Sequence, residues 1–191
     1  MTFKGLNNMK KKNWFLRILC ALLFLCMSGL IMLSIYTLSA EDGYQSGSRS
    51  SEVTEVLKEE VQTRLESTPE GMQLSERIKS FIILHSPYGS DWNLNVRKLA
   101  HFSIYFALAT MCYITLAILG IGKIGRIILT LLICGVFAIF DELHQGDVVG
   151  RTMSSSDVVI DSLGAFTSVC ILTVISMIYS FFGFILNGSK D

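Results

Sequence analysis

Two short polar runs stand at the ends of apolar segments in this chain, at residues 97–105 and 141–145. They bring together guanidinium, ammonium, carboxylate and imidazole groups, which can hold anions or transfer protons. Ionisable groups inside a membrane span cost about 2.5–3.5 kcal/mol each on insertion scales, so a functional site is their default explanation. The catalytic candidates are Asp141, Glu142 and His101, and the ligand-binding candidates are Arg97, Lys98, Tyr105, Gln145, Arg151, Ser154, Asp157 and Asp161.

Helical spacing gathers these candidates on three helix faces. Arg97, His101 and Tyr105 recur every four residues, so they share one face. Gln145 follows Asp141 by four residues and shares a second face with it. The third face carries Ser154, Asp157, Asp161, Gly164 and Ser168, and its last two members have the small-xxx-small spacing that favours close helix contact.

The charges in these runs allow two interpretations. Three residues supply positive charge, and four acids supply negative charge, namely Asp141, Glu142, Asp157 and Asp161. Ion pairs between these acids and Arg97, Lys98 and Arg151 would lock the helices in one register. Alternatively, the crowded carboxylates beside His101 raise one another's affinity for protons, which suits general acid or base chemistry. The sequence leaves both interpretations open.

The composition assigns these faces to a membrane protein. Hydrophobic residues make up 51% of the 191 residues and charged residues only 17%. We predict an all-α, polytopic membrane protein with four transmembrane helices and an external helical loop. The apolar segments that approach the roughly 20 residues needed for a crossing are 18–38, 99–119, 127–140 and 162–186.

The third apolar segment is too short to cross the membrane alone. Residues 127–140 cover about 21 Å at a rise of 1.5 Å per residue, against a hydrocarbon core of roughly 30 Å. We therefore expect this helix to continue to Gln145, which brings its polar residues to interface depth or below. The predicted core, residues 97–186, then contains helices at 99–119, 127–145 and 157–186.

Positive charges predict the orientation of the chain. The first span is preceded by five cations and no acid, namely Lys4, Lys10, Lys11, Lys12 and Arg17. The charged residues of the loop between the second and third spans are Lys123 and Arg126, again with no acid. Such residues favour the cytoplasmic side. Residues 1–17 and 187–191 are therefore expected in the cytoplasm, residues 39–96 outside, and the polar runs at the outer face.

A cleavable signal peptide is the alternative explanation of residues 1–40. Its apolar run would exceed the usual 7 to 15 residues, and Leu38 is not the small residue expected three places before a cut. A retained first span is therefore preferred.

The predicted external segment begins with a loop and continues as helix. Ser and Gly dominate residues 41–51, which argues against regular structure there. From Glu52 the apolar residues recur at helical spacing, and Ser50 or Ser51 suits the N-cap of the helix.

A second amphipathic helix is predicted from Pro69 to about Leu84, since Pro69 suits a first helical position behind Thr68. Both helices would cover the bundle mouth or lie on the bilayer. Residues 41–96 hold ten acids against five bases, which gives no sign of a nucleic-acid partner.

Thiol and metal chemistry find little support in the sequence. All five cysteines fall inside apolar spans, where they are typical small buried residues, so no disulfide framework is predicted. No cofactor is predicted either. A divalent cation bound by His101, Asp141, Glu142 and Asp157 is compatible with the ligand types, although their spacing matches no metal motif.

The order and spacing of these residues resemble the VanZ-like proteins. The matching positions are Arg97, Lys98, His101, Phe102, Tyr105, Asp141, Glu142, Gln145, Arg151, Ser154, Asp157, Asp161 and Gly164, together with residues 39–43 and Ser46 after the first span. The resemblance covers residues 18–185. Asp161 stands where the family often has Asn, and residues 146–150 replace the commoner aromatic and proline approach to the arginine. These departures concern the geometry of one loop.

The resemblance implies a bacterial multi-pass membrane protein related to one that confers low-level resistance to teicoplanin, a lipid-bearing glycopeptide that acts on cell-wall precursors outside the membrane. It implies no established reaction, so it assigns no catalytic residue.

Three functions are compatible with the sequence. First, the polar site binds the anionic or zwitterionic headgroup of a lipid, a lipid-linked wall precursor or a lipoglycopeptide, with Arg97, Lys98 and Arg151 holding the anion. Second, the protein is a membrane enzyme in which Glu142 or Asp141 is the base and His101 carries the proton. Third, it is a structural subunit whose charges lock the helices and whose external helices dock a partner. The oligomeric state stays open.

Overall fold

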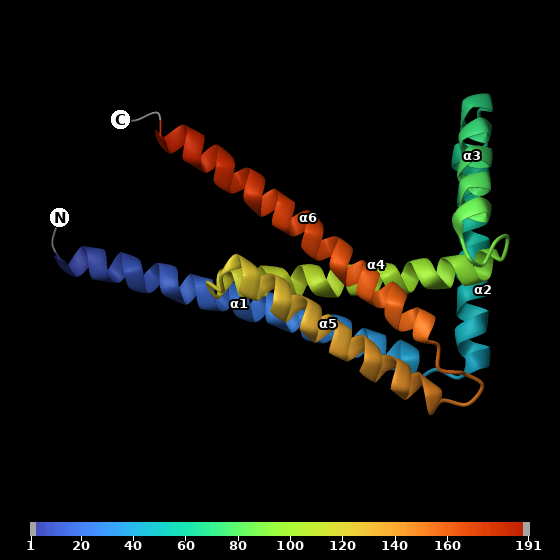
Figure 1. The fold of residues 1–191 in the computed structure, drawn as a ribbon, viewed down its shortest axis with the longest axis horizontal. Coiled ribbons are helices and arrows are strands. Elements are labelled where there is room, and N and C mark those ends of the chain that lie inside the picture. Colours follow the sequence, from blue (N-terminus) through green and yellow to red (C-terminus); the bar gives the residue numbers. More distant parts are fainter. Residues whose placement is uncertain (1–2, 189–191) are drawn as a thin grey trace.

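The computed structural model describes the backbone of residues 3–188 and the side chains of residues 14–182, and every element within that part of the chain is helical. The elements are α1 (Phe3–Ser39), α2 (Gly43–Glu60), the π-helical turn η1 (Val61–Leu65), α3 (Pro69–His85), α4 (Trp92–Ile118), α5 (Lys123–Gly146) and α6 (Ser155–Gly188). The predicted all-α fold is confirmed. Figure 1 shows a bundle of four long helices with α2 and α3 lying across one of its ends.

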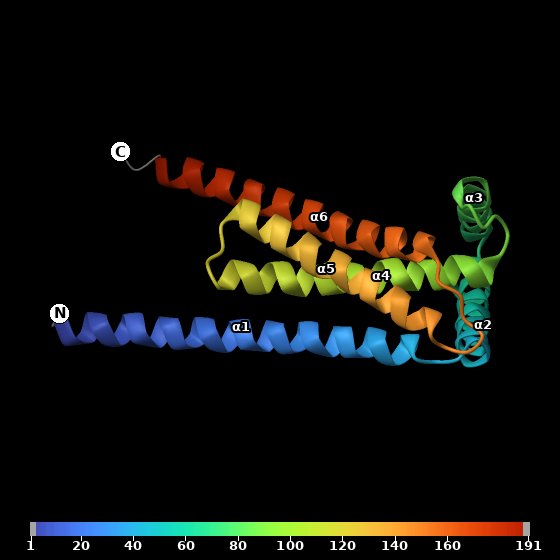
Figure 2. The same cartoon turned by 60° about the horizontal axis from the view of Figure 1, so that its bottom comes forward.

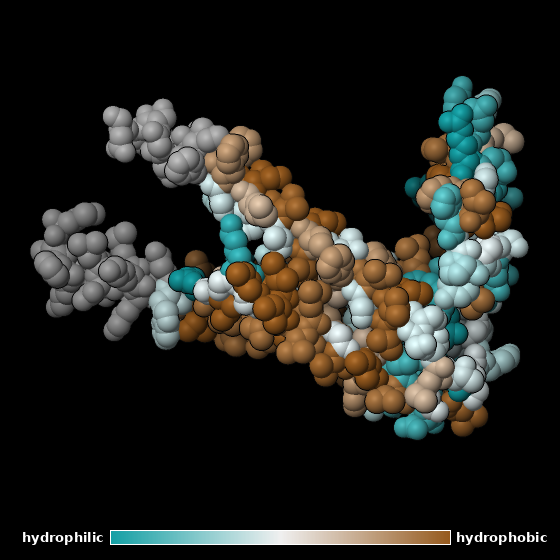
Figure 3. Space-filling model, viewed as in Figure 1, coloured by the Kyte–Doolittle hydropathy of each residue, from teal (hydrophilic) through white to brown (hydrophobic). Residues whose placement is uncertain are grey.

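In the described part of the chain, four helices are long and apolar enough to cross a membrane, namely α1, α4, α5 and α6. Figure 3 shows an almost continuous apolar surface along this bundle and a more polar surface over α2 and α3. An exposed apolar surface of this extent is expected where lipid replaces water as the solvent. The protein is therefore a multi-pass membrane protein.

The bundle begins and ends on the same side. In Figures 1 and 2 the start of α1 and the end of α6 lie at one end of the bundle, and α2 and α3 lie at the other. This arrangement is what four passes produce. We call the end that carries α2 and α3 the capped end.

Helix α4 lies at the centre of the bundle and packs most extensively against α6. The two backbones approach closely at Gly164, where a Cβ atom would lie 2.2 Å from the carbonyl oxygen of Phe102. One turn further along, the hydroxyl oxygens of Ser168 and Thr110 are 2.7 Å apart. The small-residue contact predicted for Gly164 and Ser168 is thus present, and it allows α4 and α6 to meet along their polar faces.

Helix α5 continues past its apolar part, as its length predicted. It runs without a break from Lys123 to Gly146, so Asp141, Glu142 and Gln145 lie on its last two turns and are buried. An α-helix pairs the backbone groups of its interior within one segment, as a membrane span requires, so the span itself carries these polar side chains.

The predicted loop at residues 41–51 is wrong, because α2 begins at Gly43. Its N-cap is Asp42, whose carboxylate accepts a hydrogen bond from the Gln45 N–H at 2.8 Å, and not Ser50 or Ser51. Contact with the α5–α6 connection also holds this end of the helix. The Gly43 N–H donates to Val149 O at 3.1 Å, and a Cβ on Gly43 would lie 2.1 Å from the Gly150 carbonyl oxygen. Glycine therefore serves close packing here.

Helix α3 has the start that the sequence predicted. Thr68 is the N-cap and accepts a hydrogen bond from the Gly71 N–H at 3.1 Å, and Pro69 occupies the first turn, where it loses no hydrogen bond. Helix α3 packs against η1 and leaves large apolar side chains such as Phe81 and Leu84 exposed. Whether this layer contacts the bilayer stays a prediction.

All five cysteines are free. Cys112 and Cys134 are buried as predicted, whereas Cys26 and Cys170 are exposed on the apolar surface of the bundle, so the prediction of burial is wrong for these two.

Candidate functional site

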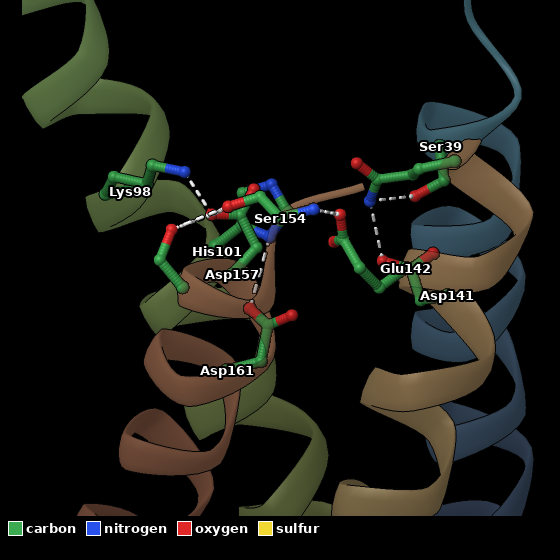
Figure 4. A network of polar contacts seen from close by, with 10 residues as sticks. Ser39, Lys98, His101, Asp141, Glu142, Ser154, Asp157 and Asp161 are labelled. Carbon is green, nitrogen blue, oxygen red and sulfur yellow. Dashed lines mark hydrogen bonds and ion pairs between the residues drawn. The ribbon is translucent and has the colours of Figure 1, made fainter. Parts of the chain in front are cut away.

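The predicted site residues meet at the capped end of the bundle. Figure 4 shows Lys98 and His101 on α4, Asp141 and Glu142 on α5, Asp157 and Asp161 on α6, with Ser39 of α1 and Ser154 of the α5–α6 connection beside them. Hydrogen bonds and ion pairs divide these residues into two groups. One group joins the helices, and the other faces a pocket.

An ion pair and a histidine–carboxylate contact join α4 to α6. Lys98 forms an ion pair with Asp157, and the side chains are only 14% and 3% exposed. One turn deeper, His101 Nδ1 lies 3.1 Å from Asp161 Oδ1. Each acid therefore has a basic partner on the facing helix, which is the polar lock that the sequence offered as one interpretation.

Glu142 secures the connection that leads into α6. Its carboxylate accepts a hydrogen bond from the Ser154 N–H. Ser154 directly precedes the first residue of α6, where backbone donors lack partners within the helix, so a carboxylate is well placed there. The Ser154 hydroxyl in turn lies 3.4 Å from Asp157. Glu142 thus acts on α6 through the loop.

Asp141 and Gln145 face α1. The Gln145 amide donates to Asp141 Oδ2 at 2.9 Å and to the Ser39 hydroxyl at 3.2 Å. All three side chains are buried. One oxygen of Asp141, Oδ1, has no hydrogen-bond partner among the described residues. A buried acceptor without a partner normally indicates a water, an ion or a ligand group.

Arg151 caps the end of α1. Its guanidinium donates to the carbonyl oxygens of Leu38 and Ser39, at 3.3 and 3.1 Å. These are the last carbonyls of α1, which lack partners within the helix and carry its partial negative charge. Burial lowers the pKa of Arg151, and the neighbouring charge of Arg97 lowers it further. Arginine nevertheless keeps its proton in proteins, so Arg151 stays positively charged.

A pocket with a cavity volume of about 190 Å³ opens between α1, α2 and α4. Arg97 and Arg151 line it together with His101, Tyr105 and Asp141. Tyr105 is fully buried, and its hydroxyl has no partner within the described part of the chain. Apolar side chains complete the wall, namely Ile35, Leu38, Val53, Val96 and Ile104. The pocket combines positive charge, unpaired polar atoms and an apolar wall.

Helix α2 supplies Arg49, Ser46 and Ser50 to the pocket. None of them was among the predicted site residues, although Ser46 is one of the positions that carry the family resemblance. Arg49 forms an ion pair with Glu41, which lines the same pocket. These α2 residues were not predicted as part of the site because the Ser and Gly content of residues 41–51 predicts a loop. The signal was Asp42 three residues before Gln45, which is the spacing of an N-cap followed by Gln at the third helical position.

The structure therefore separates the predicted candidates. Those that line the pocket are Arg97, His101, Tyr105, Asp141 and Arg151. Those that lie outside its lining, in contacts between helices, are Lys98, Glu142, Gln145, Ser154, Asp157 and Asp161. The second histidine of the polar runs, His144, is also outside, since its ring stacks on Tyr36 with centroids 4.5 Å apart.

A metal ion finds no prepared site in the part of the chain that the structure describes. No group of three or more His, Cys, Asp or Glu side chains is arranged there to bind one. The four residues considered as ligands, His101, Asp141, Glu142 and Asp157, have contacts with different partners.

Comparison with curated proteins and with solved structures gave no match. A protein-family model described as VanZ/LLP1 matches residues 14–178, which include all of α4 and α5, most of α1 and α6, both contacts between α4 and α6, and the pocket. This match extends over most of the chain and agrees with the residue pattern at the capped end. The chain therefore belongs to the VanZ/LLP1 family.

Proposed function

We propose that this protein binds the anionic or zwitterionic headgroup of an amphiphile of the cell envelope in the pocket between α1, α2 and α4. The observation that carries the proposal is the pair Arg97 and Arg151. Both arginines line one small pocket, and Arg151 Nε is buried without a partner among the described residues. An anion between the two groups would relieve their repulsion and accept charge-assisted hydrogen bonds.

The other pocket residues suit a headgroup with additional polar atoms. Asp141 Oδ1 can accept a hydrogen bond from a hydroxyl or ammonium group, and the Tyr105 hydroxyl can donate or accept one. The apolar wall would contact the first carbons of the attached chain. Lipids, lipid-linked wall precursors and lipoglycopeptides share this chemistry.

The proposal includes a location. The cations before α1 and those in the α4–α5 connection favour cytoplasmic termini, so the capped end would face outward from a bacterial membrane. An outward pocket for amphiphiles would account for low-level teicoplanin resistance in the family. For this chain, resistance is part of the proposal.

Lipid co-purification tests the binding proposal. We expect the double variant Arg97→Gln and Arg151→Gln to retain less anionic lipid than the wild type after detergent exchange, measured by mass spectrometry at equal amounts of monodisperse protein. Arg77→Gln is the matched control, because Arg77 is exposed on α3 and outside the pocket. Unchanged lipid content in the double variant would reject the proposal.

Antibiotic susceptibility tests the physiological part. A sensitive Gram-positive host would express the wild type, Arg97→Gln and His101→Ala at matched membrane levels, with vancomycin as the comparison drug. We expect the wild type to raise the inhibitory concentration of teicoplanin selectively and the variants to lose this protection. If the wild type has no effect, the resistance phenotype does not extend to this chain.

An enzymatic role is the second candidate, and one observation favours it. His101 lines the pocket while its Nδ1 lies 3.1 Å from the buried Asp161, the arrangement in which a carboxylate orients an imidazole that acts as a base. Asp141 would be the second acid or base. Incubating the protein with envelope lipids and searching for new products by mass spectrometry tests this role, and His101→Ala should abolish any product.

A further inference from the structure

A second and larger hollow lies next to the pocket that Arg97 and Arg151 line, which we call the arginine pocket. It is a groove of about 540 Å³ between α2, η1, α3 and the start of α4. Its apolar lining includes Leu57, Val61, Leu65, Ile78, Ile82 and Trp92. Ligand sites commonly measure about 300–1,000 Å³ and are mostly apolar, so this groove has the size and character of a binding site.

The partly buried charges in the groove already have partners. Glu66 accepts hydrogen bonds from the Ser75 hydroxyl at 2.6 Å and from Lys79 Nζ at 2.7 Å. The remaining polar lining side chains include Lys58 and Gln62, which are exposed and can stay hydrated. Because Glu66 and Lys79 are paired with each other, the groove offers an occupant mainly apolar contacts. An apolar chain fits these walls.

The groove adjoins the arginine pocket. Val96 of α4 lines both of them. On α2, Val53 lines the pocket and its neighbour Thr54 lines the groove. The same two helices, α2 and α4, therefore form walls of both hollows, and Val96 lies at their common boundary.

We propose that the groove holds the acyl chain of the amphiphile whose headgroup occupies the arginine pocket. This inference rests on the proposed function and narrows its ligand to a molecule with an anionic head and an extended single chain. Because α2 and α3 run across the bundle, the chain would lie along this layer and no longer among the neighbouring lipids (Figure 1). The protein would then take the amphiphile out of the bilayer.

Tryptophan fluorescence can detect a chain in the groove. The sequence has two tryptophans, Trp14 and Trp92, and only Trp92 lines the groove. In a Trp14→Phe background we expect lysophosphatidylglycerol with a brominated chain to quench Trp92 and to reach saturation near one lipid per protein. In the control, Trp92→Phe, the exposed Trp14 should be quenched in proportion to the lipid fraction of the micelle, without saturation.

Filling the groove gives a second test. Ile82→Phe adds volume to its wall and should weaken saturable quenching by about tenfold, which is the scale of a misfit of a few carbon atoms in an apolar pocket. Ile83→Phe is the matched control, since Ile83 adjoins Ile82 on α3 but is exposed and absent from the lining. Both variants must elute as monodisperse protein.

The variant Arg97→Gln with Arg151→Gln separates the two proposals. If it weakens quenching and Ile82→Phe does too, both are supported. If the arginine variant lowers lipid co-purification while Trp92 shows no saturable quenching, the headgroup site stands and the acyl groove is overturned. If quenching saturates regardless of the arginines, the groove binds chains by itself, and the proposed headgroup function is overturned.

Discussion

Removing one partner of the ion pair between Lys98 and Asp157 should destabilise the bundle more than removing one partner of a surface pair. It joins α4 to α6 with side chains that are 14% and 3% exposed. Lys98→Met would leave the Asp157 carboxylate buried, with only the Ser154 and Ser156 hydroxyls, each 3.4 Å away, as partners. We therefore expect a large loss in the free energy of unfolding.

The structure sets the size of this loss. Removing one partner of a buried pair costs about 3–5 kcal/mol, because the other charge stays uncompensated. The two hydroxyls and the partial exposure of Lys98 reduce that value, so we expect about 3 kcal/mol for Lys98→Met. The double variant Lys98→Met with Asp157→Asn leaves no charge behind and should lie within about 1 kcal/mol of the wild type.

Reversible unfolding in mixed micelles, followed by circular dichroism as the denaturing detergent is increased, measures these differences. The control is Arg64→Met, which breaks the Arg64–Glu60 pair on side chains that are 80% and 55% exposed. It should cost less than about 0.5 kcal/mol, as exposed pairs four residues apart do. Two results would refute the lock between Lys98 and Asp157. One is a cost for Lys98→Met no larger than that of the control, and the other is a double variant whose cost equals the sum of the costs of Lys98→Met and Asp157→Asn alone.

Two further predictions concern packing and pH. Gly164→Val should destabilise the protein by about 2 kcal/mol in the same assay, because its Cβ would meet the Phe102 carbonyl, whereas Gly135→Val, with nothing within 4 Å of its Cβ, should be nearly neutral; equal effects would refute the close contact. Hydrogen bonding to Lys79 lowers the pKa of Glu66 below 4.5, and the same bond raises that of Lys79 above 10.5. Both groups are charged at pH values between 4.5 and 10.5, so their ion pair stabilises the packing of α3 against η1 in that range. This stabilisation is lost as the pH falls through the pKa of Glu66 or rises through the pKa of Lys79. Protease cleavage in α3 should increase outside this range, and Glu66→Gln should remove the dependence in acid.

The sequence predicted the elements where one physical requirement dominates. The length of hydrocarbon to be crossed required α5 to extend beyond Phe140, and it does. Pro69 behind Thr68 marked the start of α3 within one residue. Gly164 marked the close contact between α4 and α6. In each case local sequence and tertiary contact favour the same structure.

Where the two disagree, the prediction was wrong or incomplete. Gly43 and the serines after it have poor helix propensity, which predicted a loop, yet the Asp42 cap and the contact with Gly150 hold helix there. The second of these depends on the distant α5–α6 connection, which no local pattern reveals. The contribution of Arg49 to the pocket was therefore not predicted.

The adjacent acids Asp141 and Glu142 show why composition alone did not resolve the site. Successive residues of an α-helix point about 100° apart, so neighbours in sequence contact different neighbours in space. Asp141 turns toward α1 and lines the pocket, while Glu142 holds the loop before α6. Charge replacement at Asp141 is thus a change to the pocket, and the same replacement at Glu142 is a change to the scaffold. The polar motif thus combines two structural roles, and under the proposed function only the residues on the pocket side would determine which amphiphile is bound.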